Sequence, residues 1–134
     1  MSIRNDYILD MINQFADSIC DFMLKSKGGL EYDAIQGYEE IVGRALDMDA
    51  QTVLELSPAS LVTMFQISAT DESLAIYAVF ALERVYELLL ASNEPLARLR
   101  HEQATAIAAS YGFDLNEVPP EVQERLDASE PLTV

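Results

Sequence analysis

The sequence contains few of the residues on which metal and redox sites depend. Its 134 residues include one cysteine, Cys20, one histidine, His101, and no tryptophan. A single cysteine cannot close a disulfide within the chain, which suits a protein of the reducing cytoplasm. One histidine and one distant cysteine also make a poor ligand set for zinc. We therefore expect a cytoplasmic protein that holds no metal or other cofactor.

Basic residues are scarce as well. Eight Lys and Arg stand against 23 Asp and Glu, which gives a formal net charge of −15 at pH 7. No Lys or Arg occurs between Arg44 and Arg84. A phosphate backbone is bound through clustered cations, so the composition argues against nucleic acid as a partner. Anionic membrane surfaces are disfavoured for the same reason.

Long hydrophobic runs are absent from the sequence. The longest, "LAIYAVFAL" from Leu74 to Leu82, has about half of the roughly 20 residues needed to cross a bilayer. The first residues, "MSIRNDYILDMINQ", carry Asp10 and Asn13 where an export signal would need an apolar core. We therefore expect neither a signal peptide nor a membrane-spanning helix.

Glycine and proline are few, at five each, and they interrupt a strongly helical pattern. From Asp6 to Ser26 the apolar residues are spaced one, three and four apart, as on one face of an amphipathic helix. Gly28 and Gly29 predict its end, because glycine readily adopts the left-handed conformation common at helix C-termini. A second helix is predicted from Glu31 to about Leu46, and the short link indicates an antiparallel pair.

Further helical segments follow along the chain. Asp49 and Ser57 are suitable N-cap residues for two brief helices. The segment 71–92 opens with acidic residues and then stays apolar on nearly every side, which predicts the central helix of the fold. The segment 95–111 predicts another long helix, and Pro120 begins a final helix of one or two turns.

The fold class follows from these segments. Nowhere do apolar and polar residues alternate strictly between turn signals, so no strand is predicted. We expect an all-α fold of stacked antiparallel αα-hairpins, with two longer hairpins at 6–47 and 71–112. Residues 1–118 would form a single helical domain. Residues 119–134 would form a short C-terminal helix and an acidic tail, which we expect to be mobile.

Two sets of segments carry a resemblance to known families. "GGLEYDAIQGYEEIVGRALDMD" is similar to the second half of a tetratricopeptide (TPR) unit, with its glycine turn, tyrosine, alanine and "AL-x-x-D" ending. More broadly, "RNDYILDMINQFA", "ALDMD", "LSPASLV" and "RHEQATAIAASYGFDL" resemble a family of small bacterial all-helical proteins whose function is uncharacterised. The resemblance implies a TPR-like fold and carries over no catalytic residue.

The residue types that could support catalysis are poorly arranged for it. "HEQAT" from His101 to Thr105 lacks the second histidine that a zinc protease motif requires. Cys20 lies beside Asp17 and Asp21, whose charges would raise the pKa of its thiol and weaken it as a nucleophile. We therefore expect no enzymatic activity and no catalytic residue.

The stretch "LARLRHEQATAIAASYG" from Leu96 to Gly112 places two polar side chains, Arg100 and Gln103, inside an apolar helical stripe. Polar groups in that position must find partners, so they predict either a structural network between helices or the floor of a binding groove. In an antiparallel hairpin Arg100 would come level with Glu87, and Gln103 with Glu83. We expect Arg100 to pair with Glu87.

The function expected from the sequence is a non-catalytic protein-interaction or scaffold module, whose partner is another protein or a second copy of the chain. On the central helix, Ile76 and Phe80 share an arc with acidic residues, so they are either covered by another segment or form an apolar contact patch. The alternative is a small-molecule-binding or enzymatic helical bundle with a pocket around Arg100 and Gln103.

Overall fold

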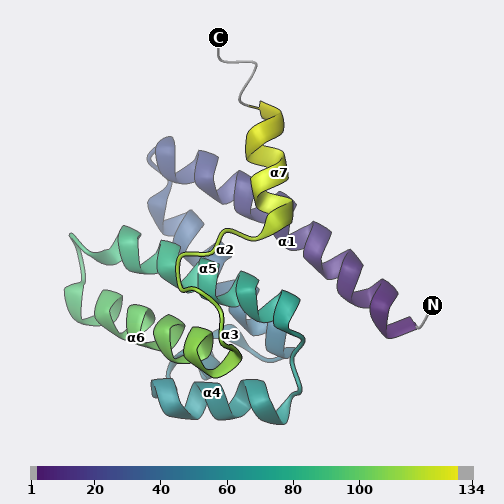
Figure 1. The fold of residues 1–134 in the computed structure, drawn as a ribbon. Helices are drawn as coiled ribbons and strands as arrows, with labels where there is room; N and C mark the ends of the chain where they lie inside the picture. Colours follow the sequence, from purple (N-terminus) through teal and green to yellow (C-terminus); the bar gives the residue numbers. More distant parts are fainter. Residues whose placement is uncertain (1–2, 130–134) are drawn as a thin grey trace.

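The computed structural model describes residues 3–129, which form seven α-helices and no strand (Figure 1). The helices are α1 (Ile3–Lys27), α2 (Glu31–Leu46), α3 (Ala50–Leu54), α4 (Pro58–Ile67), α5 (Glu72–Leu89), α6 (Glu94–Tyr111) and α7 (Pro120–Ser129). The all-α prediction is confirmed over this range. The end of the expected acidic tail, residues 130–134, lies outside the described residues.

Side-chain caps fix where four of the helices begin. Asp49, Ser57, Asp71 and Asn93 each accept a hydrogen bond from a backbone N–H in the first turn of the helix that follows. Such bonds satisfy donors that have no partner inside the helix. Gly112 ends α6 with a φ of 81°, in the left-handed region where glycine has no Cβ penalty. The N-caps Asp49 and Ser57 are those that the sequence predicts.

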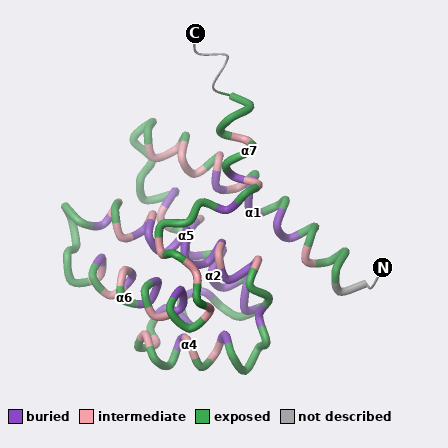
Figure 2. Tube along the Cα trace, in the orientation of Figure 1, coloured by how far each residue is buried: buried purple, intermediate pink, exposed green. Residues whose placement is uncertain are grey.

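The core is built around α5, which packs against α1, α2 and α6. Most of its side chains are buried, and Figure 2 shows the buried trace concentrated at the centre of the bundle. Helices α1 and α2 approach closely at Gly37, where an added Cβ would overlap the ring of Phe22. Helix α4 is the outermost helix on one side, and it packs against α6 (Figure 1).

The final helix, α7, crosses back onto α1. Its Val122 is fully buried, and Glu121 accepts a hydrogen bond of 2.8 Å from the hydroxyl of Tyr77 on α5. Arg125 donates to Asp17 of α1 at 2.9 Å. At ten residues α7 is longer than the one or two turns expected, because these contacts add tertiary stabilisation to a segment whose own helical pattern is weak.

No helix within residues 3–129 combines the length and the apolar character required to cross a membrane. The apolar run expected to be a buried helix, residues 74–82, lies in α5 at the centre of the bundle.

Candidate functional site

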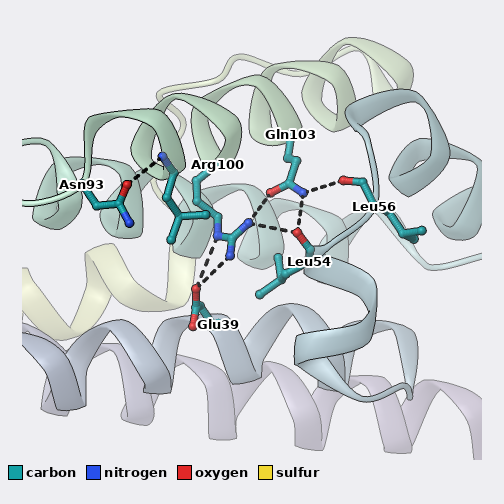
Figure 3. Close-up of polar contacts among 7 residues, drawn as sticks. Glu39, Leu54, Leu56, Asn93, Arg100 and Gln103 are labelled. Atoms are coloured by element: carbon teal, nitrogen blue, oxygen red, sulfur yellow. Dashed lines mark hydrogen bonds and ion pairs between the residues drawn. The ribbon is translucent and has the colours of Figure 1, made fainter.

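Arg100 and Gln103 of α6 form a buried polar network with α2 and α3 (Figure 3). Arg100 donates from Nε and Nη2 to Oε2 of Glu39 at 3.3 and 3.2 Å. Its Nη1 donates to the carbonyl of Leu54 at 3.0 Å and to Oε1 of Gln103 at 3.2 Å. Gln103 in turn donates from Nε2 to the carbonyls of Leu54 and Leu56 at 3.1 and 2.9 Å. We call these five residues the Arg100 network.

The network satisfies backbone groups that α3 cannot satisfy itself. The last carbonyls of any α-helix have no N–H partner within the helix, and α3 has only five residues. The carbonyls of Leu54 and Leu56 are turned toward α6, where solvent is excluded: Gln103 is fully buried and Arg100 is 6% exposed. A buried carbonyl without a donor is costly, so the two α6 side chains hold the end of α3 in place.

The prediction that Arg100 pairs with Glu87 is wrong. Glu87 pairs instead with Arg84 of its own helix, at 2.9 Å, while Arg100 reaches Glu39 on α2. Glu83 does not meet Gln103 either, since it contacts His101. The acid that sequence reasoning missed, Glu39, lies four residues after Ile35 and three before Val42. It therefore interrupts the apolar stripe of α2 just as Arg100 interrupts that of α6, and this signal could have identified it.

His101 forms a second polar contact between α6 and α5. Its Nδ1 lies 2.7 Å from Oε2 of Glu83, whose side chain is 8% exposed. The imidazole also stacks against Tyr86, with 4.6 Å between ring centroids. The only histidine of the chain is thus engaged by a carboxylate and an aromatic ring of one neighbouring helix, an arrangement that orients the ring and joins the two helices.

The residues expected to form a contact patch on α5 are not both at the surface. Phe80 is only 4% exposed, and the guanidinium of Arg84 lies over its ring, 4.4 Å from the centroid. Ile76 is half-buried. An arginine one turn along the same helix therefore covers Phe80, so Phe80 offers no open apolar surface.

An open groove lies elsewhere, between the C-terminal half of α1 and the end of α7. We call it the α1–α7 groove; it encloses about 410 Å³ and is lined by Asp17, Cys20, Met23, Leu24, Lys27, Arg125, Leu126 and Ser129. Leu24 is 69% exposed and Leu126 is 37% exposed. These large apolar side chains therefore leave apolar surface open to solvent at the rim of the groove.

The charges around the α1–α7 groove are unevenly paired. Arg125 is held by Asp17 at 2.9 Å. Lys27, at the end of α1, makes no ion pair with any described side chain. Among residues 3–129 it is therefore a cation without an acidic partner at the rim of this groove.

Cys20 belongs to this groove but is not activated as a nucleophile. Burial raises the pKa of its thiol, the positive charge of Arg125 lowers it, and Asp17 raises it. The net shift is upward, so the thiol carries less thiolate at neutral pH than an exposed cysteine does. The direction agrees with the sequence-based expectation, but its main cause is desolvation rather than the neighbouring acids.

Metal ligands do not gather anywhere in residues 3–129: no group of three or more His, Cys, Asp or Glu side chains has the geometry to hold an ion.

Comparison with known proteins gives no significant match to this chain among protein-family models, curated proteins or solved structures.

Proposed function

We propose that the chain is a non-catalytic protein-interaction module that receives an amphipathic helix of a partner protein in the α1–α7 groove. The observation that carries the proposal is the exposure of Leu24 and Leu126 on facing sides of this groove. The groove between α1 and α7 can accept the apolar stripe of a third helix, as in other cases of helix-in-groove recognition. Burying Leu24 alone would remove a largely solvated leucine from water.

The dimensions of the groove suit a helix. On α1 its lining residues run from Asp17 to Lys27, a rise of about 15 Å at 1.5 Å per residue. That length matches about three turns of a docked helix. Lys27 at the rim would pair with an acidic side chain flanking the apolar stripe of the partner.

The two polar side chains of the alternative pocket, Arg100 and Gln103, are already engaged, and this supports the non-catalytic proposal. All three nitrogen atoms of the Arg100 guanidinium donate hydrogen bonds, and both polar atoms of the Gln103 amide are paired. A ligand could bind these groups only by breaking the Arg100 network. For this reason we do not favour the alternative of a small-molecule pocket around Arg100 and Gln103.

We also propose that the helices are arranged as in TPR-like proteins. Short links join α1 to α2 and α5 to α6, and the helices of each pair pack against one another, as helical hairpins do in such folds. Superposition of an experimental structure on TPR repeats tests this arrangement, and helix crossing angles outside the range of those repeats would reject it.

A site-specific crosslinking experiment tests the interaction. A photo-crosslinking amino acid is placed at position 24 in the groove, and at position 9 as a matched control, because Leu9 is an exposed leucine (53%) on the same helix. We expect a discrete protein adduct from position 24 that is absent from position 9. The adduct should disappear when Leu126→Asp is added, since the charge would face the docked helix.

Two results would reject the proposal. Equal adducts from positions 24 and 9 would indicate non-specific contact. A crosslink from position 24 only to a small molecule would instead make the α1–α7 groove a ligand site.

A further inference from the structure

The charges of this acidic chain are not evenly spread. Its longest stretch without any Asp, Glu, Lys or Arg is residues 56–70, "LSPASLVTMFQISAT", and the next longest is residues 103–113, "QATAIAASYGF". In a chain with 31 charged residues, surface without charge is therefore expected mainly where these two stretches lie. The first contains the whole of α4, and the second contains the C-terminal half of α6.

The fold places these two stretches side by side. At one end, Gln103 donates to the carbonyl of Leu56 at 2.9 Å. At the other end, the hydroxyl of Tyr111 donates to the carbonyl of Thr70 at 2.7 Å, and its ring packs on Phe65. Helix α4 therefore runs in the same direction as the second half of α6, along its flank (Figure 1).

The outward side chains of the two stretches lie on two helices that pack together, and none of them is charged. We call this surface the charge-free face; its exposed residues are Ala59, Ser60, Thr63, Gln66 and Ile67 of α4, and Thr105, Ala109 and Ser110 of α6. Ile67 is 73% exposed, more than any other large apolar side chain among the described residues. Because most of the other side chains are small, the face offers little obstruction around Ile67.

Three of the four hydroxyl groups of the charge-free face donate hydrogen bonds within their own helices, and the fourth, that of Ser60, accepts one of 3.0 Å from the hydroxyl of Ser57. Thr63 donates to the carbonyl of Ala59 at 3.1 Å, Thr105 to that of His101 at 2.8 Å, and Ser110 to that of Ile107 at 2.8 Å. A polar group that keeps its hydrogen bond costs little to remove from water. The face can therefore be covered by another surface without leaving these donors unpaired.

We propose that the charge-free face binds a second copy of this chain, through an isologous contact centred on α4. A two-fold contact brings the same patch from both copies together, so the patch must be compatible with itself. Two acidic patches would repel each other, whereas a neutral patch around a protruding isoleucine does not. A basic partner, in contrast, would be recognised through carboxylates, and this face has none.

The border of the face predicts how the contact responds to salt. Glu55, Asp71, Glu102 and Asp114 are the first charged residues beyond the two neutral stretches, and all four are exposed. In the dimer these carboxylates and the net charge of −15 on each copy repel across the edge of the contact. Salt screens that repulsion, so added salt should tighten the dimer. A contact built from ion pairs would weaken instead.

The experiment measures the dimer dissociation constant of the full chain by sedimentation equilibrium, at low and at high sodium chloride. Ile67→Glu adds a charge to the centre of the face, and two-fold symmetry places one such charge on each copy, so that the two repel each other. Leu24→Glu is the matched control, because it adds the same charge at an equally exposed leucine in the α1–α7 groove. We expect Ile67→Glu to weaken the dimer by at least about tenfold, Leu24→Glu to leave it nearly unchanged, and salt to strengthen the unsubstituted dimer.

Each other result counts against the inference. A chain that stays monomeric up to millimolar concentration overturns it, as does a dimer that salt weakens. A dimer that survives Ile67→Glu but is lost in Leu24→Glu would place self-association in the α1–α7 groove. Circular dichroism confirms that both variants keep their helices, which we expect because both side chains are largely exposed. The inference and the proposed function concern different surfaces, so one can fail without the other.

Discussion

The guanidinium of Arg100 on α6 binds a single carboxylate oxygen of Glu39 on α2, 61 residues earlier in the chain, through Nε and Nη2. Both side chains are nearly excluded from water, at 7% and 11% side-chain exposure. The pair joins two helices that are not neighbours in sequence. It also positions Arg100 to hold the C-terminal carbonyl of α3.

Breaking this pair should cost more stability than any surface ion pair of the chain. Arg100→Met leaves the buried Glu39 carboxylate without its cation, and we expect the free energy of unfolding to fall by about 3–5 kcal/mol. Glu39→Gln in the same chain should recover part of the loss, because the uncompensated charge is then gone. Urea unfolding of the two single variants and the double variant gives the coupling energy.

The matched control is the pair of Arg98 and Glu94, also on α6, whose side chains are 68% and 64% exposed. The same cycle there should give a coupling energy of about 0–1 kcal/mol. Equal coupling energies for the two pairs would contradict a buried Arg100 network.

The stability of the protein should fall at alkaline pH in a way that depends on Tyr38. Burial raises the pKa of Tyr38 to about 12, whereas a tyrosine in an unfolded chain has a pKa of about 10. Because the folded pKa is the higher one, the stabilisation is complete below about pH 10 and is lost as the pH rises toward 12. At about pH 11, Tyr38→Phe should therefore reduce the loss in the free energy of unfolding by about 1 kcal/mol.

Urea unfolding at neutral and at alkaline pH measures this difference. Identical alkaline profiles for the Tyr38→Phe variant and the unsubstituted chain would show that Tyr38 ionises with its unfolded pKa.

Gly43, in the last turn of α2, should tolerate no side chain because the segment after the helix packs directly against it. A Cβ there would lie 2.7 Å from the carbonyl oxygen of Met48 and 2.9 Å from the backbone nitrogen of Ala50. Backbone atoms cannot rotate away as a side chain can, so we expect Gly43→Ala to cost about 1–3 kcal/mol. Gly28→Ala, whose Cβ would come no closer than 3.4 Å to Leu24, should change stability by less than about 1 kcal/mol. Equal urea midpoints for the two variants would refute the close approach.

Ala69, in the turn between α4 and α5, has a φ of 50°. An L-residue pays a steric cost in this left-handed conformation that glycine avoids. Glycine loses more entropy on folding, which offsets part of this gain. We therefore expect Ala69→Gly to raise the free energy of unfolding by about 0.5–1 kcal/mol. Ala109→Gly, in helix α6, should lower it by a similar amount. Thermal unfolding of both variants tests the sign, and a loss of stability in Ala69→Gly would contradict the strained turn.

The sequence by itself determined where most helices begin and end. Asp49, Ser57, Asp71 and Asn93 act on N–H groups two or three residues ahead of them, and Gly112 acts on its own φ angle. These are local interactions, so a one-dimensional pattern contains all of the information they need. The apolar segment that became α5 was likewise identifiable as the central helix, because only burial on all sides suits a helix that is apolar all round.

Only the tertiary structure decided which side chains meet. The hairpin register pointed Arg100 toward Glu87, but the rotation of α6 about its axis turns Arg100 toward α2 and α3, and no pattern within two helices specifies a third. The sequence left open whether Phe80 is covered or belongs to a contact patch, and in the fold the guanidinium of Arg84 lies over its ring. The charge-free face arises in the same way. Its two stretches are visible in the sequence, but the contacts of Gln103 and Tyr111 with the segments flanking α4 bring them together. These contacts join residues that are 47 and 41 positions apart, which become neighbours only when helices pack.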